Sequence, residues 1–265
     1  MDLLDADSVR AYVRRTQPKW IVSSAAYTAV DAAETDRDAA WAVNATAPGV
    51  LAEEASALSA NVLHLSTDYV FPGIGDRPWV ESDQTGPLNF YGTSKLAGEQ
   101  AIAASGVAHV ILRTSWVYSS TGKNFVRTMV RLLSTKDTPL RVVADQHGAP
   151  TSADDLASVI SAIVGRPEPL QRLSGVYHCA GGGETTWAGL ASAVRASLIG
   201  EHGLTPPEII PVPSSEYPTP AARPGNSRLC CDKLWDAFGL TVPEWRISLK
   251  KILGDITATD LPHRG

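Results

Sequence analysis

Short apolar runs alternate with amphipathic stretches along most of the chain, and this alternation limits the folds that the chain can adopt. The runs at 20–26, 61–66 and 109–118 are typical of buried strands, and the stretches between them are typical of helices. A strand, a helix and a second strand in succession form one unit of a parallel sheet. The sequence therefore predicts an α/β protein with a parallel sheet.

Further elements follow from the same pattern. Helices are predicted at 8–16, 39–59, 87–105 and 124–134 and from 152 onward, and another strand at 140–144. From about residue 170 the chain reads as a strand, a glycine-rich turn and a helix, with Thr185 or Thr186 as the helix cap. The segment 206–229 is rich in proline and polar residues. It is expected to be a loop region, and such regions often carry ligand contacts.

Composition excludes several classes of protein. Of the 265 residues, 44% are hydrophobic and 19% are charged, which is the balance of a globular protein. A net charge of −5 argues against broad nucleic-acid or anionic-membrane binding, and no run approaches the roughly 20 apolar residues of a membrane span. The acidic N-terminus is unlike a signal peptide, and Cys179, Cys230 and Cys231 lack metal-ligand spacing. We expect a cytoplasmic protein, and the cysteines give no indication of a metal site.

Tyr91 and Lys95 are four residues apart in the segment LNFYGTSKLAGEQ, so both point to the same side of the predicted helix. A free tyrosine has a pKa of about 10, and a nearby ammonium favours the phenolate and lowers that pKa. The pair is therefore suited to general acid–base catalysis. Taken alone, such a spacing arises often by chance, and the first turn of a surface helix is the ordinary interpretation.

Thr67 lies 24 residues before Tyr91, at the predicted carboxyl end of a strand, where ligands bind in open α/β sheets. A hydroxyl there can hydrogen-bond a carbonyl oxygen that Tyr91 protonates. The alternative is a strand followed by a turn in which Asp68 bonds its own backbone. Thr67, Tyr91 and Lys95 together indicate a proton-transfer site, which none of them indicates alone.

These residues carry a resemblance to a known family. The segments STDYVFPG and PLNFYGTSKLAGE resemble the extended short-chain dehydrogenase/reductases, and within them the dTDP-4-dehydrorhamnose reductases. Other segments resemble the same branch, in its order: AAYTAVDAAE, RTSWVYSSTGKNFVRTM, DQHGAPTSADDLA, GVYHCAGGGETTW and YPTPAARPGNSRL. The resemblance implies a doubly wound Rossmann-type sheet and reduction of the C4 keto group of dTDP-4-dehydro-6-deoxy-L-mannose to dTDP-L-rhamnose, with NADPH or NADH.

The resemblance also implies a role for each matching residue. Tyr91 would protonate the C4 oxygen, Lys95 would hold the nicotinamide ribose, and Thr67 would complete the triad. Further cofactor contacts would come from Asp2, Leu3, Ala25, Ala26, Thr28 and Ser66. Substrate contacts would come from Thr67, Asp68, Trp116, Asn124, Arg223, Asn226, Ser227 and Arg228. From the residues alone, core packing of Trp116 and a solvated arginine loop are the ordinary alternatives. Asn44 resembles a water-organising helix asparagine, or is a solvated helix residue.

The start of the chain departs from the family. Residues 1–30 contain no GxxGxxG-type loop, whose glycines let the backbone approach a cofactor pyrophosphate. We therefore expect an incomplete dinucleotide-binding domain at 1–150, lacking roughly one βαβα unit and exposing a strand edge. A mainly substrate-binding domain is expected at 151–265, interleaved with the first. The preference between NADPH and NADH, a magnesium ion and a homodimer stay open.

Two other functions stay open at this point. A chain without a phosphate-binding loop is compatible with a non-catalytic nucleotide-sugar-binding or regulatory protein. Another nucleotide-sugar reductase or epimerase would share Thr67, Tyr91 and Lys95 and differ in its sugar pocket.

Overall fold

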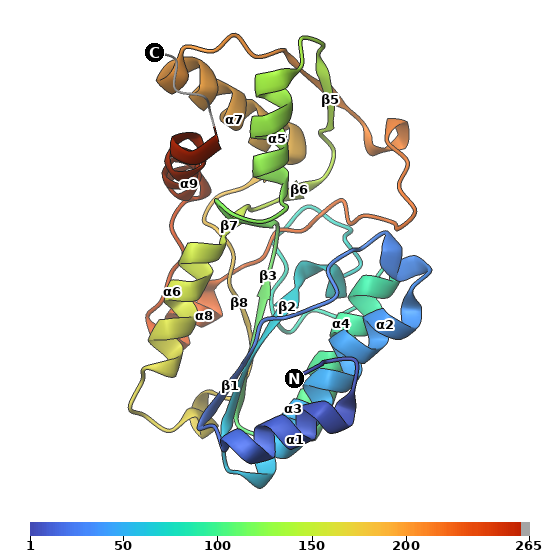
Figure 1. The fold of residues 1–265 in the computed structure, drawn as a ribbon, viewed down its shortest axis with the longest axis vertical. Coiled ribbons are helices and arrows are strands. Elements are labelled where there is room, and N and C mark those ends of the chain that lie inside the picture. Colours follow the sequence, from blue (N-terminus) through green and yellow to red (C-terminus); the bar gives the residue numbers. More distant parts are fainter. Residues whose placement is uncertain (261–265) are drawn as a thin grey trace.

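The computed structural model describes residues 1–260 and is built around a four-stranded sheet in the order β1–β2–β3–β8 (Figure 1). The strands are β1 (Trp20–Ser23), β2 (Asn61–Thr67), β3 (His109–Thr114) and β8 (Gly175–His178). All three neighbouring pairs are parallel. The predicted α/β class with a parallel sheet is confirmed.

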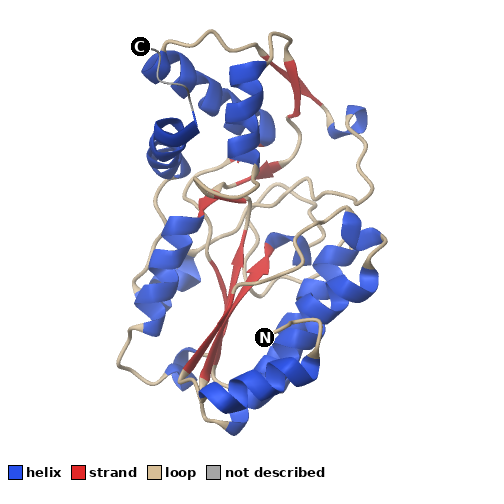
Figure 2. Ribbon diagram, viewed as in Figure 1, coloured by secondary structure: helices blue, strands red, loops and turns tan. Residues whose placement is uncertain are grey.

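Helices lie on both faces of this sheet (Figure 2). One face carries α1 (Ala6–Thr16), α3 (Ala47–Ala57) and α4 (Phe90–Ala104), and the other carries α6 (Ala153–Val164) and α8 (Asp232–Phe238). Successive side chains of β2 alternate between these layers: Val62 packs with α3 and α4, and Leu63 packs with α6 and α8. The next residue on the α4 side is His64. The alternation therefore buries a histidine next to the helix that carries Tyr91 and Lys95.

A second group of elements lies beyond the carboxyl ends of the strands (Figure 1). It consists of the helices α5 (Phe125–Thr135), α7 (Trp187–His202) and α9 (Trp245–Asp260) and the parallel pair β5 (Leu140–Val143) and β10 (Ile209–Val212). These elements share one hydrophobic core. Two short pairs lie between this group and the sheet, β4 (Val117–Tyr118) with β7 (Thr151–Ser152) and β6 (His147–Gly148) with β9 (Thr185–Thr186).

Most predicted elements are confirmed to within a few residues, with three differences. The strand predicted at 109–118 is broken because Trp116 has a φ of 48°, which interrupts extended pairing between β3 and β4. The helix predicted at 39–59 is α2 (Arg37–Trp41), a π-helical turn at 42–46 and α3, with Pro48 in the first turn of α3. The segment 206–229 contains β10, which proline and isolated polar residues concealed in the sequence.

One edge of the sheet is open to solvent in the described part of the chain. β1 is bonded on one side to β2 and forms an edge of the sheet, where Val22 is 43% exposed.

Among the described helices, none combines the length and apolar character that crossing a membrane requires.

Close packing at Gly98 gives a first prediction. A Cβ atom on Gly98 would lie 2.1 Å from the carbonyl oxygen of Asn44, so Gly98→Ala forces α4 away from the π-helical turn. Overpacking of this kind costs about 1–3 kcal/mol. We expect a lower midpoint of urea unfolding for Gly98→Ala. Gly200→Ala, in open space on α7, is the matched control and should leave the midpoint unchanged or raise it. Equal stability of the two variants would contradict the packing argument.

Candidate active site

Tyr91 is held against Thr67 by the way α4 begins. The side chain of Asn89 caps the helix by accepting a hydrogen bond of 2.8 Å from the backbone N–H of Gly92. A Cβ atom on Gly92 would lie 2.2 Å from the carbonyl oxygen of Tyr69, so this glycine lets the helix start lie directly on the turn that follows β2. The Thr67 side chain lies beside the Tyr91 hydroxyl, where its polar contact lowers the pKa of Tyr91. The structure thus brings together these two residues, which the sequence placed in one proton-transfer site.

Lys95 lies one helical turn after Tyr91 on α4 and faces β2. Its side chain is 2% exposed, and its ammonium donates hydrogen bonds of 2.6 Å to the carbonyl oxygen of Leu65 and 3.1 Å to Nε2 of His64. Burial lowers the pKa of Lys95 to about 8, against the opposing effect of the Glu99 carboxylate. Tyr91 and Lys95 therefore both face the carboxyl half of β2, as their four-residue spacing indicated.

The pKa of Tyr91 differs from the expectation. Burial, followed in effect by the Asp68 carboxylate, raises it to about 12, while the polar contact with Thr67 lowers it. The prediction that Lys95 lowers this pKa is wrong for the protein by itself, because the ammonium of Lys95 is directed to Leu65 and His64. Tyr91 is accordingly a fully protonated hydroxyl at neutral pH.

Asp68 occupies the adjoining position, 3% exposed, at the start of the turn after β2. Burial raises the pKa of Asp68 to about 7, against the lowering effect of hydrogen bonds from Ser227 and Thr67. Within residues 1–260, Oδ2 of this carboxylate has no hydrogen-bond partner. A buried carboxylate oxygen without a partner next to Tyr91 is suited to accept a hydrogen bond from a hydroxyl group of a ligand. Ser227 reaches it from the loop region at 206–229.

Asn44 fixes the turn after β1 to the start of α4. It is fully buried, and its side chain binds the backbone N–H and carbonyl of Tyr27 at 2.8 and 3.1 Å and the hydroxyl of Ser94 at 3.1 Å. The alternative of a solvated helix residue is therefore wrong. Ala25 and Thr28, in the same turn, are exposed and carry short side chains. This leaves open space beside the carboxyl end of β1.

The remaining residues predicted to contact a cofactor have other partners in the structure. The hydroxyl of Ser66 donates to Glu99, which forms a buried ion pair of 2.6 Å with Arg113. The Asp2 carboxylate accepts a hydrogen bond from the backbone of Leu4, ahead of α1, and Leu3 packs against the core between α1 and α3. Ala26 is half-buried in the turn that Asn44 holds. Their proposed contacts with a cofactor stay predictions.

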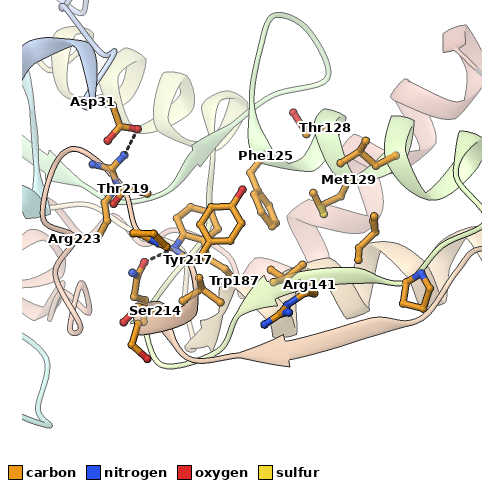
Figure 3. Close-up of a pocket in the computed structure, with 18 of the residues that line it drawn as sticks. Asp31, Phe125, Thr128, Met129, Arg141, Trp187, Ser214, Tyr217, Thr219 and Arg223 are labelled. Atoms are coloured by element: carbon orange, nitrogen blue, oxygen red, sulfur yellow. Dashed lines mark hydrogen bonds and ion pairs between the residues drawn. The ribbon is translucent and has the colours of Figure 1, made fainter.

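A cavity of about 900 Å³ lies in the second group of elements, between α5, β5 and the loops at 214–223 (Figure 3). Phe125, Trp187 and Tyr217 give it an aromatic lining, and Arg141 and Arg223 supply positive charge. The guanidinium of Arg223 pairs with Asp31 at 2.8 Å, so one side of the cavity is closed by the segment that follows β1.

The predicted substrate residues divide between the cavity and its supports. Arg223 lines the cavity, and Trp116 stacks on the cavity residue Trp187 with ring centroids 3.7 Å apart. Asn226 is a structural support, since its side chain donates to the carbonyls of Ile74 and Arg77. Two further predicted residues have comparable partners: Asn124 caps α5, and Arg228 pairs with Glu184 at 3.0 Å.

The sequence did not single out the aromatic lining of the cavity or Arg141. These side chains come from α5, β5, α7 and the loop before residue 220, which are far apart along the chain. The one signal available was the family-like segment beginning at Tyr217. In the described part of the chain, no group of three or more histidine, cysteine or acidic side chains is arranged to hold a metal ion.

The fold and site define a class of protein. A tyrosine and a lysine one turn apart on a helix, beside a threonine at the end of a central parallel strand, match the arrangement expected of a short-chain dehydrogenase/reductase.

The comparisons narrow this class. The sequence model of the family described as "RmlD substrate binding domain" matches residues 1–258. The chain is 44% identical to the dTDP-4-dehydrorhamnose reductase of Salmonella typhimurium over 264 residues, covering 97% of this chain and 86% of that protein. It is 46% identical to the corresponding reductase of Sinorhizobium fredii, covering 95% and 85%. The structure of the Bacillus anthracis reductase in complex with NADP superposes with a TM-score of 0.87 at 33% identity, covering 96% and 87%. The chain belongs to the dTDP-4-dehydrorhamnose reductase family.

The buried carboxyl of Asp68 gives a second prediction, on stability against pH. Its pKa rises from 3.8 to about 7 on folding, so the folded protein binds a proton that the unfolded chain releases between those values. Stability from this group is present below about pH 4 and is lost as the pH rises to about 7. At 1.36 kcal/mol per pKa unit, the cost at pH 8 is at most about 4 kcal/mol.

Asp68→Asn should therefore raise the midpoint of urea unfolding at pH 8 and leave it nearly unchanged at pH 4. Asp83→Asn is a control of opposite sign, because the Arg77 guanidinium lowers the pKa of Asp83 to about 2. That variant should lose stability at pH 8. A gain for Asp68→Asn that is equal at both pH values would contradict the predicted titration.

Proposed function

We propose that this protein reduces the C4 keto group of dTDP-4-dehydro-6-deoxy-L-mannose to dTDP-L-rhamnose, in dTDP-rhamnose biosynthesis. The observation that carries the proposal is the half-buried, protonated hydroxyl of Tyr91, which lies beside Thr67 at the end of β2. Relatives more than 40% identical over nearly the whole chain are dTDP-4-dehydrorhamnose reductases, which supports the choice of substrate.

Tyr91 is the general acid in this proposal. Its pKa of about 12 keeps the hydroxyl protonated at neutral pH, so the proton is available when negative charge develops on the C4 oxygen. Thr67 lies beside the tyrosine hydroxyl, and its own hydroxyl, which donates to Asp68 in the structure, would rotate to donate to the same substrate oxygen. Asp68, with its free Oδ2, accepts a hydrogen bond from a neighbouring hydroxyl of the sugar.

The residues around β1 and β2 fit a nicotinamide dinucleotide. NADPH or NADH would supply the hydride that C4 accepts. The exposed short side chains of Ala25 and Thr28 leave room at the carboxyl end of β1, and Lys95 has one N–H beyond those it gives to Leu65 and His64. That N–H would bind the ribose hydroxyls. The relative from Bacillus anthracis was solved with NADP, which favours NADPH without excluding NADH.

The cavity between α5 and β5 is the proposed site of the dTDP group. Its aromatic side chains suit stacking with thymine, and Arg141 and Arg223 suit the diphosphate. The position of this cavity supports the proposal that residues 1–150 form mainly a cofactor-binding domain and residues 151–265 mainly a substrate-binding domain. The division is interleaved, because α5 and β5 share a core with α7 and α9. We also propose a cytoplasmic location, in keeping with three free cysteines.

Replacing the proposed acid tests this function. Tyr91→Phe keeps the ring and removes the proton, so we expect the rate of NADPH oxidation with the dTDP-4-keto sugar to fall at least about 100-fold. Tyr118→Phe is the control, because Tyr118 is buried in the second group of elements and its hydroxyl lies beside the carbonyl of Trp245. Retained turnover in Tyr91→Phe would overturn the assignment. A wild-type chain that binds the dTDP-sugar without oxidising NADPH would favour the non-catalytic alternative.

Arg223 tests the placement of the diphosphate. Arg223→Gln removes a cation from the cavity, and hydrogen bonds to charged groups contribute about 1.5–3 kcal/mol. We expect the dissociation constant for dTDP, measured by calorimetry, to rise about 10- to 100-fold. Arg10 lies on the distant α1 and pairs with Glu53 of α3, so Arg10→Gln should leave the dissociation constant for dTDP unchanged. Equal affinities in the two variants would place the diphosphate elsewhere.

A further inference from the structure

His64 is a titratable side chain in the interior of the sheet for which the proposed chemistry has no role. It lies in the middle of β2, beside Ser23 of the edge strand β1 in the parallel register, and its ring is fully buried. Its two ring nitrogens each have one partner: Nδ1 lies 3.1 Å from the hydroxyl of Ser23, and Nε2 lies 3.1 Å from the ammonium of Lys95. The imidazole thus connects the outer strand to the lysine of the active site.

The partners of the ring determine its protonation state. An ammonium can only donate, so Nε2 of His64 must accept from Lys95, and the ring proton must lie on Nδ1 and be donated to Ser23. Burial and the adjacent Lys95 ammonium both lower the pKa of His64 well below its ordinary value, which agrees with a neutral ring. A neutral imidazole in this tautomer is a fixed acceptor.

The ammonium of Lys95 is oriented by two acceptors. Leu65 supplies a backbone carbonyl and His64 supplies Nε2, which together use two of the three N–H groups. With two directions occupied, the direction of the third is set by the tetrahedral geometry of the nitrogen. Without His64 the ammonium would keep a single anchor and rotate about it.

Other charged groups near Lys95 do not replace this anchor. Glu99 is one turn away on α4 and acts on the Lys95 pKa, but its carboxylate is held by Arg113 from β3 and by Ser66 from β2. Ser23, on β1, reaches the lysine only through the imidazole. Among the described residues, His64 is therefore the side chain with which the Lys95 ammonium forms a hydrogen bond.

We propose that His64 is a positioning residue for the reductase site, whose neutral imidazole, locked by Ser23, aims the Lys95 ammonium at the ribose of the nicotinamide cofactor. The target of the ammonium rests on the proposed function; the hydrogen-bonded chain Ser23–His64–Lys95 does not. A hydrogen bond to the ammonium also favours the charged form of the lysine, so loss of His64 should make Lys95 a weaker base.

The first test uses the wild-type chain. Nitrogen-15 NMR of the histidine ring distinguishes a proton on Nδ1 from one on Nε2, and we expect Nδ1–H at His64 throughout the neutral pH range. A proton on Nε2 would overturn the proposal, since Lys95 could then not donate to it.

The second test compares variants by NMR titration of the Lys95 side chain. His64→Leu removes the acceptor and should lower the Lys95 pKa by about one unit from its value near 8. His64→Gln can return an acceptor oxygen near the position of Nε2 and should restore most of that shift. His178→Leu is the control for burial: His178 is equally buried and binds the carbonyls of Trp79 and Cys230. An unchanged Lys95 pKa in His64→Leu would overturn the proposal.

The third test concerns the cofactor. His64→Leu should raise the KM for NADPH about tenfold with a smaller change in kcat, and should move the alkaline fall of kcat/KM to lower pH, because the charged lysine is lost earlier. If neither the KM for NADPH nor the pH at which kcat/KM falls on the alkaline side changed, the claim that His64 directs Lys95 toward the ribose would be wrong. A wild-type chain without turnover would instead refute the proposed reaction, and the ring tautomer and the Lys95 pKa would still decide the positioning role.

Discussion

The close packing of α4 along β2 is the constraint on which the rest of the site depends. Two glycines let α4 approach its neighbours closely, because a Cβ atom would meet the carbonyl of Tyr69, in the turn after β2, at Gly92 and that of Asn44, in the π-helical turn, at Gly98. With the helix this near, residues one turn apart on α4 fall opposite alternate residues of the strand. Tyr91 then lies at Thr67, while Lys95 reaches the carbonyl of Leu65.

This packing also places charged side chains in the interior, and they are stabilised by one another. Lys95 and Glu99 enter the same buried layer from one helix, and Arg113 from β3 neutralises Glu99 in an ion pair whose partners are 5% and 4% exposed. Such a pair adds little net stability, but removal of either partner would leave a buried charge. With Glu99 paired to Arg113, the Lys95 ammonium binds His64 and the carbonyl of Leu65 on β2.

The sequence brought Thr67, Tyr91 and Lys95 together because their positions depend on helix spacing and on the general rule for where strands of a parallel sheet end. The four-residue spacing of Tyr91 and Lys95 fixes their common face, and the rule that ligands bind at the carboxyl ends of parallel strands locates Thr67. The direction of Lys95 was not predictable, because its partner His64 lies 31 residues away on a strand whose facing depends on register. The pKa of Tyr91 was predicted with the wrong sign, since burial outweighs a lysine that points elsewhere.

The cavity was less accessible to sequence reasoning for a related reason. Its walls exist only because β10, hidden in a proline-rich segment, pairs with β5 and brings Tyr217 and Arg223 toward Phe125 and Trp187. The Arg223–Asp31 pair then ties that loop to the segment after β1, next to the turn that Asn44 holds. The proposed substrate cavity and the open space beside β1 are thus linked through Asp31, which binds both Arg223 and the backbone N–H of Ala221. A diphosphate that draws Arg223 away from Asp31 would weaken the contact between the cavity and the segment after β1, so binding at the proposed substrate and cofactor sites should be energetically coupled.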